Sequence, residues 1–123
     1  MELIFESKNY RIFSQVRIPT RKGHFIYFIK IGEDSQLFKI GTTGNLFRRM
    51  KEIGRQYRTD IFILWVSPPY KKSTTLAIEQ KTIDRWRQQE GIVYIKNDRF
   101  FFSKEIKEVT IKVRKEYRIS IWF

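Results

Sequence analysis

Two runs of aromatic and β-branched residues, separated by a short polar segment, constrain the fold of this chain most strongly. The first run, residues 24–31, reads His-Phe-Ile-Tyr-Phe-Ile-Lys-Ile, a composition that is typical of a β-strand. Residues 32–35, Gly-Glu-Asp-Ser, have the composition of a turn, and residues 36–40 resume the strand pattern. The sequence therefore predicts an antiparallel hairpin in the central sheet of the fold.

A helix and a buried strand are expected after this hairpin. Residues 41–44, Gly-Thr-Thr-Gly, break the strand pattern, and Asn45 is a good N-cap for a following helix. The apolar stripe of that helix has helical spacing and comprises Leu46, Met50, Ile53 and Tyr57. Residues 60–66 are almost entirely apolar and predict a buried strand, which Pro68 and Pro69 end.

The remaining segments complete a mixed α/β (α+β) domain. A second helix is expected to begin at a cap among Ser73, Thr74 and Thr75 and to run to about Gln89. Residues 99–102 predict a short buried strand with Phe100–Phe102 in the core, and the alternating tail 119–123 predicts another strand. Ser103 is expected to cap a last helix with an apolar side made of Ile106, Val109, Val113 and Tyr117.

These elements predict a small central antiparallel sheet flanked by helices. We expect one domain over residues 23–123, preceded by an N-terminal extension, residues 1–22, that forms an edge strand or an arm. The extension alternates apolar and polar residues and ends in a basic segment that contains a proline and a glycine.

The charge of the chain favours an anionic partner. Lys and Arg number 25 against 13 acidic residues, a formal net charge of +12, and nucleic acid is the commonest partner of so basic a domain. The charge alone is also compatible with a soluble basic protein that has no such partner. We expect no membrane contact, because basic residues are spread over the whole chain and no single strongly amphipathic basic helix stands out, and the longest apolar run is too short to cross a bilayer.

The absence of cysteine excludes disulfides, thiolate nucleophiles and zinc–thiolate sites. We expect a soluble cytoplasmic protein, monomeric or homodimeric, that binds DNA, with RNA as the alternative.

Two charged residues stand out by their positions on the predicted helices. Glu79 shares its helical face with three apolar residues, Leu76, Ile83 and Trp86. A carboxylate on such a face is costly unless a salt bridge or a metal ion satisfies it, and both remain open. Arg49 flanks the apolar stripe of its helix, where it either packs along the core edge or holds a phosphate. Its neighbour Arg48 points to solvent.

The hairpin and the helix after it also carry a recognisable pattern. Phe25-Ile26-Tyr27 lies on the first strand, Lys39-Ile40-Gly41 ends the second, and Arg49 follows Gly41 by eight residues. Over residues 24–102 this arrangement resembles the signature of the GIY-YIG nuclease superfamily, in the phage-type and restriction-type branch with KIG in place of YIG. Phe25 stands where that signature has its first glycine.

The resemblance implies a metal-dependent endonuclease that hydrolyses DNA phosphodiester bonds with one metal ion. By this analogy Tyr27 is the general base and Glu79 binds Mg²⁺ or Mn²⁺. An unperturbed phenol, with a pKa near 10, is a poor base, so a nearby cation must lower its pKa. The catalytic residues implied are Tyr27, Lys39, Arg49, Glu79 and Asn97. Contacts to nucleic acid are expected from Thr42, Thr43, Asn45, Arg48 and Arg55.

Each of these residues has a plainer interpretation when it is taken alone. Tyr27 would be a core tyrosine, Lys39 an exposed strand lysine and Gly41 part of a turn. The only histidine, His24, is expected to face solvent at a strand start and is assigned no role. A catalytically inactive nucleic-acid-binding module on the same fold, or a structural RNA-binding protein, is therefore the alternative to a nuclease.

Overall fold

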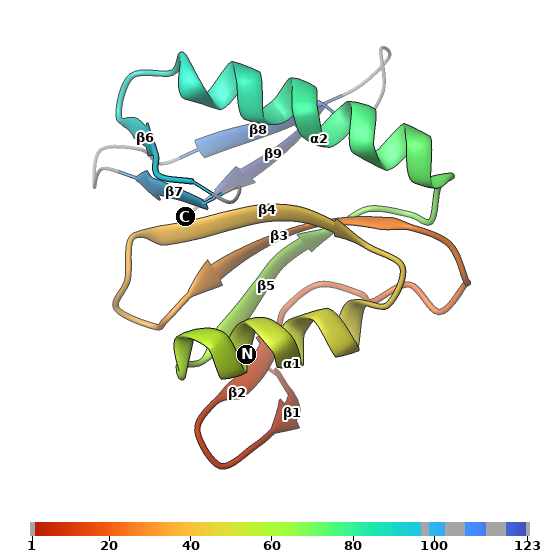
Figure 1. Cartoon of the computed structure of the whole chain (residues 1–123), viewed down its shortest axis with the longest axis vertical. Coiled ribbons are helices and arrows are strands. Elements are labelled where there is room, and N and C mark those ends of the chain that lie inside the picture. The colour runs from red at the N-terminus through yellow and green to blue at the C-terminus, as the bar shows by residue number, and fades with distance from the viewer. Residues whose placement is uncertain (1, 97–98, 103–107, 113–117, 123) are drawn as a thin grey trace.

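The computed structural model describes residues 2–96, 99–102, 108–112 and 118–122, which form a seven-stranded sheet with a helix on each face and a separate two-stranded sheet (Figure 1). In the larger sheet the strand order is β1-β2-β5-β3-β4-β7-β6, and only the β2–β5 pair is parallel among the described strands. The expected α+β class is confirmed. The elements are β1 (Glu2–Glu6), β2 (Arg11–Ser14), β3 (Phe25–Ile31), β4 (Leu37–Thr43), α1 (Leu46–Tyr57), β5 (Ile61–Val66), α2 (Lys72–Arg87), β6 (Ile92–Tyr94), β7 (Arg99–Phe102), β8 (Glu108–Lys112) and β9 (Arg118–Trp122).

The predicted hairpin is present as β3 and β4. The two strands pair in register from Lys30 and Phe38 to Phe25 and Thr43. The expectation that residues 41–44 break the strand was wrong for residues 41–43, which belong to β4. Two of these residues are β-branched threonines, and all three pair with β3. The hairpin therefore delivers Gly41 opposite Tyr27.

Alternate residues of the strands pack into two apolar clusters on opposite faces of the sheet. On one face, called the α1 face, Tyr27 and Ile29 pack with Met50 and Ile53 of α1. On the other, the α2 face, a second set packs with α2, namely Ile26, Phe28, Ile40, Ile83 and Trp86. Figure 1 shows the two helices on opposite sides of β3 and β4. Burial of both sheet faces explains why β3 and β5 are almost continuously apolar.

Helix α1 matches its prediction closely. The side chain of Asn45 accepts a hydrogen bond from Arg48 N at 3.1 Å, so Asn45 is the N-cap. Leu46, Met50 and Ile53 are buried, and Tyr57 packs against the same cluster.

Helix α2 begins earlier than predicted. Its N-cap is Lys71, which makes no side-chain cap, so none of residues 73–75 has the expected role. The hydroxyl of Thr75 instead donates to Lys72 O within the first turn, and Thr75 is buried. The apolar face of the helix is also shifted, because Leu76 is 45% exposed whereas Ile83 and Trp86 are buried.

The predicted last helix was wrong in the part that the structure describes. Residues 108–112 form β8, which pairs antiparallel with β9. Three consecutive β-branched residues, Val109, Thr110 and Ile111, favour a strand, and Ile111 is buried against the α2-face cluster. The predicted terminal strand is confirmed as β9. Ser103, Ile106, Val113 and Tyr117 lie outside the described residues.

Two smaller differences concern the strands before β8. Strand β6 was not predicted, and it pairs with β7 at the edge of the sheet. Phe100 and Phe102 are buried as expected, but Phe101 is 49% exposed because strand alternation turns it to the opposite face.

Residues 2–14 extend the sheet at its other edge. Strand β2 pairs with β1 and runs parallel to β5. Tyr10 and Ile12 are buried in the α1-face cluster. A Cβ at Gly54 of α1 would overlap the Tyr10 ring, so this glycine permits close packing of the helix on the segment. None of the described helices is long and apolar enough to cross a membrane.

Candidate active site

Tyr27 and Arg49 meet on the α1 face of the sheet. Arg49 Nε donates a hydrogen bond to Tyr27 Oη at 3.3 Å. Tyr27 lies within β3 and is 1% exposed, whereas the side chain of Arg49, in the first turn of α1, is 34% exposed. The capped helix start fixes the position of Arg49, whose backbone N–H donates to Asn45 O at 3.1 Å. The guanidinium therefore connects a buried phenol to solvent.

Gly41 makes room for the Tyr27 phenol. The two residues are partners across the β3–β4 ladder, and a Cβ at position 41 would overlap the phenol oxygen. The phenol ring can lie over the neighbouring strand only because residue 41 has no side chain. The sequence interpretation placed Gly41 in the motif and in a turn but did not connect it with the Tyr27 ring. The hairpin register, which puts a glycine opposite a tyrosine, was the available signal.

Arg49 remains positively charged in this setting. Partial burial by itself would lower the pKa of Arg49, but its interactions with Tyr27 and Glu52 outweigh this effect and raise the pKa above its ordinary value. Glu52 Oε2 lies 3.1 Å from Arg49 Nη1, and Glu52 Oε1 lies 3.7 Å from Arg48 Nε. An anion that binds Arg49 must therefore compete with the Glu52 carboxylate.

Lys39 lies on the same face of the sheet as Tyr27. Its neighbours Phe38 and Ile40 belong to the α2-face cluster, so strand alternation puts Lys39 and Gly41 on the α1 face. The lysine is buried, which differs from the exposed strand lysine of the plainer interpretation. Two basic residues, Lys39 and Arg49, thus lie on the side of the sheet that holds the Tyr27 phenol.

Glu79 comes from the other side of the sheet. It is half-buried, and the residues one helical turn away, Thr75, Thr82 and Ile83, are buried. It therefore lies on the inward side of α2. That helix packs on the α2 face, whereas Arg49 belongs to α1 (Figure 1). A site that uses both side chains must lie at an end or edge of the sheet, where groups from the two faces can meet.

The other predicted site residues fall into three groups. Thr43 and Asn45 help to build the start of α1, since Thr43 Oγ1 accepts from Asn45 N at 3.0 Å and Asn45 caps the helix. Arg48 and Arg55 are exposed on α1. Thr42 is half-buried near the end of β4, the strand that precedes α1. Asn97 lies outside the described residues. Among the residues that are described, no three His, Asp or Glu side chains form a metal-binding group.

Comparison with known protein families identifies the family of this chain. The model of the T5orf172 domain matches residues 24–118, which include Tyr27, Arg49 and Glu79. This domain is associated with phage nucleases. No curated protein and no solved structure matches the chain. Because the matched region covers most of the sequence, the chain belongs to the T5orf172 domain family.

Proposed function

We propose that this protein is a metal-dependent endonuclease of the GIY-YIG type that hydrolyses DNA phosphodiester bonds. The observation that carries the proposal is the 3.3 Å hydrogen bond from Arg49 Nε to Tyr27 Oη, with Lys39 and Gly41 on the same sheet face. Membership in a nuclease-associated family and a net charge of +12 both support a nucleic-acid substrate.

Arg49 would bind the scissile phosphate. Its Nε is engaged by Tyr27, and its Nη1 contacts Glu52, which a phosphate can replace as the acceptor. Guanidinium N–H groups fixed by a capped helix would then offset the negative charge that develops on the phosphate during attack. Removal of one such donor typically slows an enzyme by about 100- to 1000-fold.

Tyr27 would take the proton of the attacking water, directly or through a second water. The Arg49 guanidinium favours the phenolate over the phenol because it donates to the oxygen that becomes negative. The phenol ring is buried, so water would reach the oxygen from the side of Arg49, which is the partly exposed member of the pair.

Glu79 would hold the metal ion. Since the described residues contain no cluster of acidic or histidine side chains, the remaining ligands would be water and substrate phosphate. Mg²⁺ commonly binds in this way, through one or two carboxylates together with phosphate oxygens, and Mn²⁺ accepts the same ligands. When bound, the ion would stabilise the leaving oxygen.

A plasmid-nicking assay tests this function. Wild-type protein with Mg²⁺ should convert supercoiled plasmid to the nicked form, whereas Arg49→Ala and Glu79→Gln should lose at least about 100-fold in rate. Arg85→Ala, which removes an exposed charge from α2, serves as the control and should retain activity. Thermal melting must show that each variant is folded. If folded wild type binds DNA but does not nick it with Mg²⁺ or Mn²⁺, the hydrolase proposal fails.

A catalytically inactive nucleic-acid-binding module is the second candidate. The observation that favours it is the origin of Arg49 and Glu79 on opposite faces of the sheet. In that case no metal ion would support cleavage of DNA. Arg49→Ala would lower the affinity for DNA, whereas Glu79→Gln would leave that affinity unchanged.

A further inference from the structure

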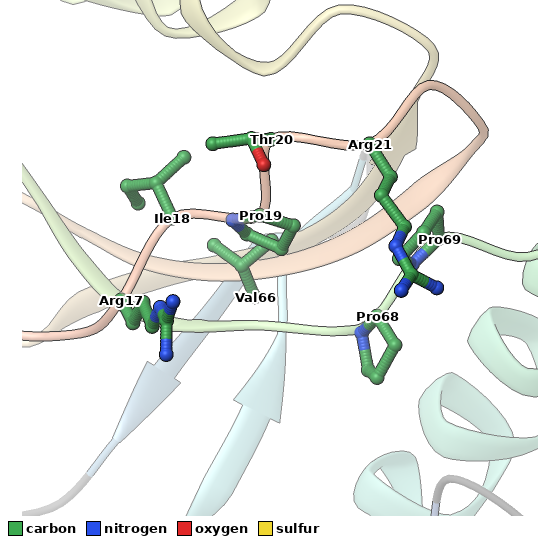
Figure 2. Close-up of a pocket in the computed structure, with 8 residues that line it drawn as sticks. All are labelled: Arg17, Ile18, Pro19, Thr20, Arg21, Val66, Pro68 and Pro69. Atoms are coloured by element: carbon green, nitrogen blue, oxygen red, sulfur yellow. The ribbon is translucent and has the colours of Figure 1, made fainter.

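The segment 17–22, called here the basic arm, lines two pockets at one end of the sheet. The first pocket has a volume of about 430 Å³ and is lined by Arg17, Ile18, Pro19, Thr20, Arg21, Val66, Pro68 and Pro69 (Figure 2). The second, of similar volume, is lined by residues 18–22 together with Phe25, Gly44, Asn45, Leu46 and Phe47. The family match begins at residue 24, so the arm precedes the part of the chain that the family describes.

The first pocket combines an apolar floor with cationic ends. Figure 2 shows Pro19 and Val66 between Arg17 and Arg21, with Pro68 near the Arg21 end. Both arginines are exposed, and neither forms an ion pair within the described part of the chain. Their positive charge is therefore available to an anionic ligand, while the floor between them suits an apolar surface.

Both pockets are lined by residues that neighbour Tyr27 in the sheet. Val66, in the floor of the first pocket, is the β5 partner of Tyr27, and neighbouring strands lie about 4.8 Å apart. Phe25, in the second pocket, precedes Tyr27 by two residues on β3, which is about 7 Å along the strand. Phe47, 41% exposed, adds an aromatic ring from the helix that carries Arg49.

We propose that the basic arm and the floor beneath it bind an unpaired nucleotide adjacent to the phosphate at Arg49. This inference rests on the proposed function for the location of that phosphate. Arg17 and Arg21 contact the flanking phosphates, and the base enters the apolar pocket, whose volume lies in the range of small-molecule sites. A base inside a duplex is stacked and paired, so intact duplex offers the pocket no free base.

Binding measurements without divalent metal test the inference independently of cleavage. The probes are a labelled single-stranded DNA, a blunt duplex of the same sequence and a single strand that is abasic at every position. Wild type should bind the normal single strand several-fold more tightly than either of the other two. Fluorescence anisotropy at several salt concentrations gives both affinity and its salt dependence.

The double variant Arg17→Ala/Arg21→Ala should lose about tenfold in affinity for the normal single strand and should bind it no better than the duplex. Its salt slope should fall by about 1.4, because each lost phosphate contact on a single strand contributes about 0.7. Lys81→Ala/Arg85→Ala is the matched control, since it removes the same charge from exposed positions on α2. The control variant should bind all three probes slightly less tightly than wild type, by the same factor for each probe.

The inference is overturned if the abasic and normal strands bind alike, or if the two double variants behave alike. Failure of this inference can be distinguished from failure of the proposed function. A protein that passes these binding tests but never nicks plasmid retains the nucleotide site and loses the hydrolase proposal. A protein that nicks plasmid but whose arm variant behaves like the control loses only the nucleotide site.

Discussion

The position of the Tyr27 ring depends on the absence of a side chain at Gly41, and adding a single methyl group at residue 41 tests this dependence. In Gly41→Ala the new Cβ would overlap the phenol oxygen. The ring must shift, so we expect a loss of stability of about 1–3 kcal/mol, as for overpacked cores, and a disturbed hydrogen bond between Arg49 Nε and Tyr27 Oη. Urea unfolding followed by circular dichroism measures the change.

Gly44→Ala is the control for this substitution. Its Cβ would meet the His24 ring at 3.3 Å, a contact that a small rotation of the imidazole relieves. Gly44→Ala should therefore cost clearly less stability than Gly41→Ala. Equal costs would show that Tyr27 is not held over Gly41 in solution.

Tyr27→Phe separates the chemistry of the hydroxyl from the packing of the ring. The ring stays in the α1-face cluster, and the hydrogen bond from Arg49 Nε is lost, so stability should fall by about 1 kcal/mol. If the phenol is the general base, plasmid nicking should fall by at least about 100-fold, within the usual contribution of such a group. Tyr57→Phe, on α1 but outside the pair, should leave nicking unchanged. Nicking by Tyr27→Phe at the wild-type rate would remove Tyr27 from the mechanism.

Local spacing predicted some of these residue positions and not others. The register of the hairpin and the position of Arg49 in the first turn of α1 are both short-range properties, so the sequence could place Tyr27, Gly41 and Arg49 near one another. Helical spacing also predicted that Glu79, Ile83 and Trp86 share the inward side of α2, but it assigned the exposed Leu76 to that side wrongly. Spacing does not reveal which sheet face a helix covers. The separation of Glu79 from Arg49 was therefore not predictable from these patterns.

At the scale of elements, the start of α1 fixes Arg49. Asn45→Ala removes the acceptor for Arg48 N and should cost about 1 kcal/mol, equivalent to roughly 4 °C in melting temperature for a domain of this size. Asn45→Ser keeps a capping oxygen and should stay within a few tenths of a kcal/mol of wild type. Calorimetric melting of both variants checks the expectation. Equal destabilisation by alanine and serine would show that the side chain acts through something other than the cap.

Some helices and strands could be predicted from sequence patterns, and others could not. Helix α1 has both a cap and a regular apolar stripe, and its prediction was confirmed. Helix α2 has no side-chain cap, so its start could not be found from capping residues. Residues 108–112 fit an apolar stripe of helical spacing through Val109, but their consecutive β-branched residues and pairing with β9 decide for a strand. Tertiary pairing overrode a helical period that rested on few residues.

At the scale of the whole molecule, residues 2–14 are part of the core that supports the candidate site. Ile12 is fully buried, and Tyr10 packs against Gly54 of α1, the helix that carries Arg49. Strand β2 also covers the edge of β5, whose Val66 pairs with Tyr27. Loss of this segment would expose an unpaired strand edge and the apolar side of α1.

Two truncations separate the contributions of β1 and β2. A variant that starts at Asn9 loses β1, whose residues are exposed or half-buried, and keeps Tyr10 and Ile12. It should melt within several degrees of wild type. A variant that starts at Gln15 loses both strands and should be less stable by several kcal/mol, since removing a buried Ile side chain alone costs about 2–5 kcal/mol. It should also associate through the free β5 edge, which size-exclusion chromatography detects. If the two truncations melt at the same temperature as monomers, β2 does not stabilise the fold, and the residues from Gln15 onward are sufficient to support the site.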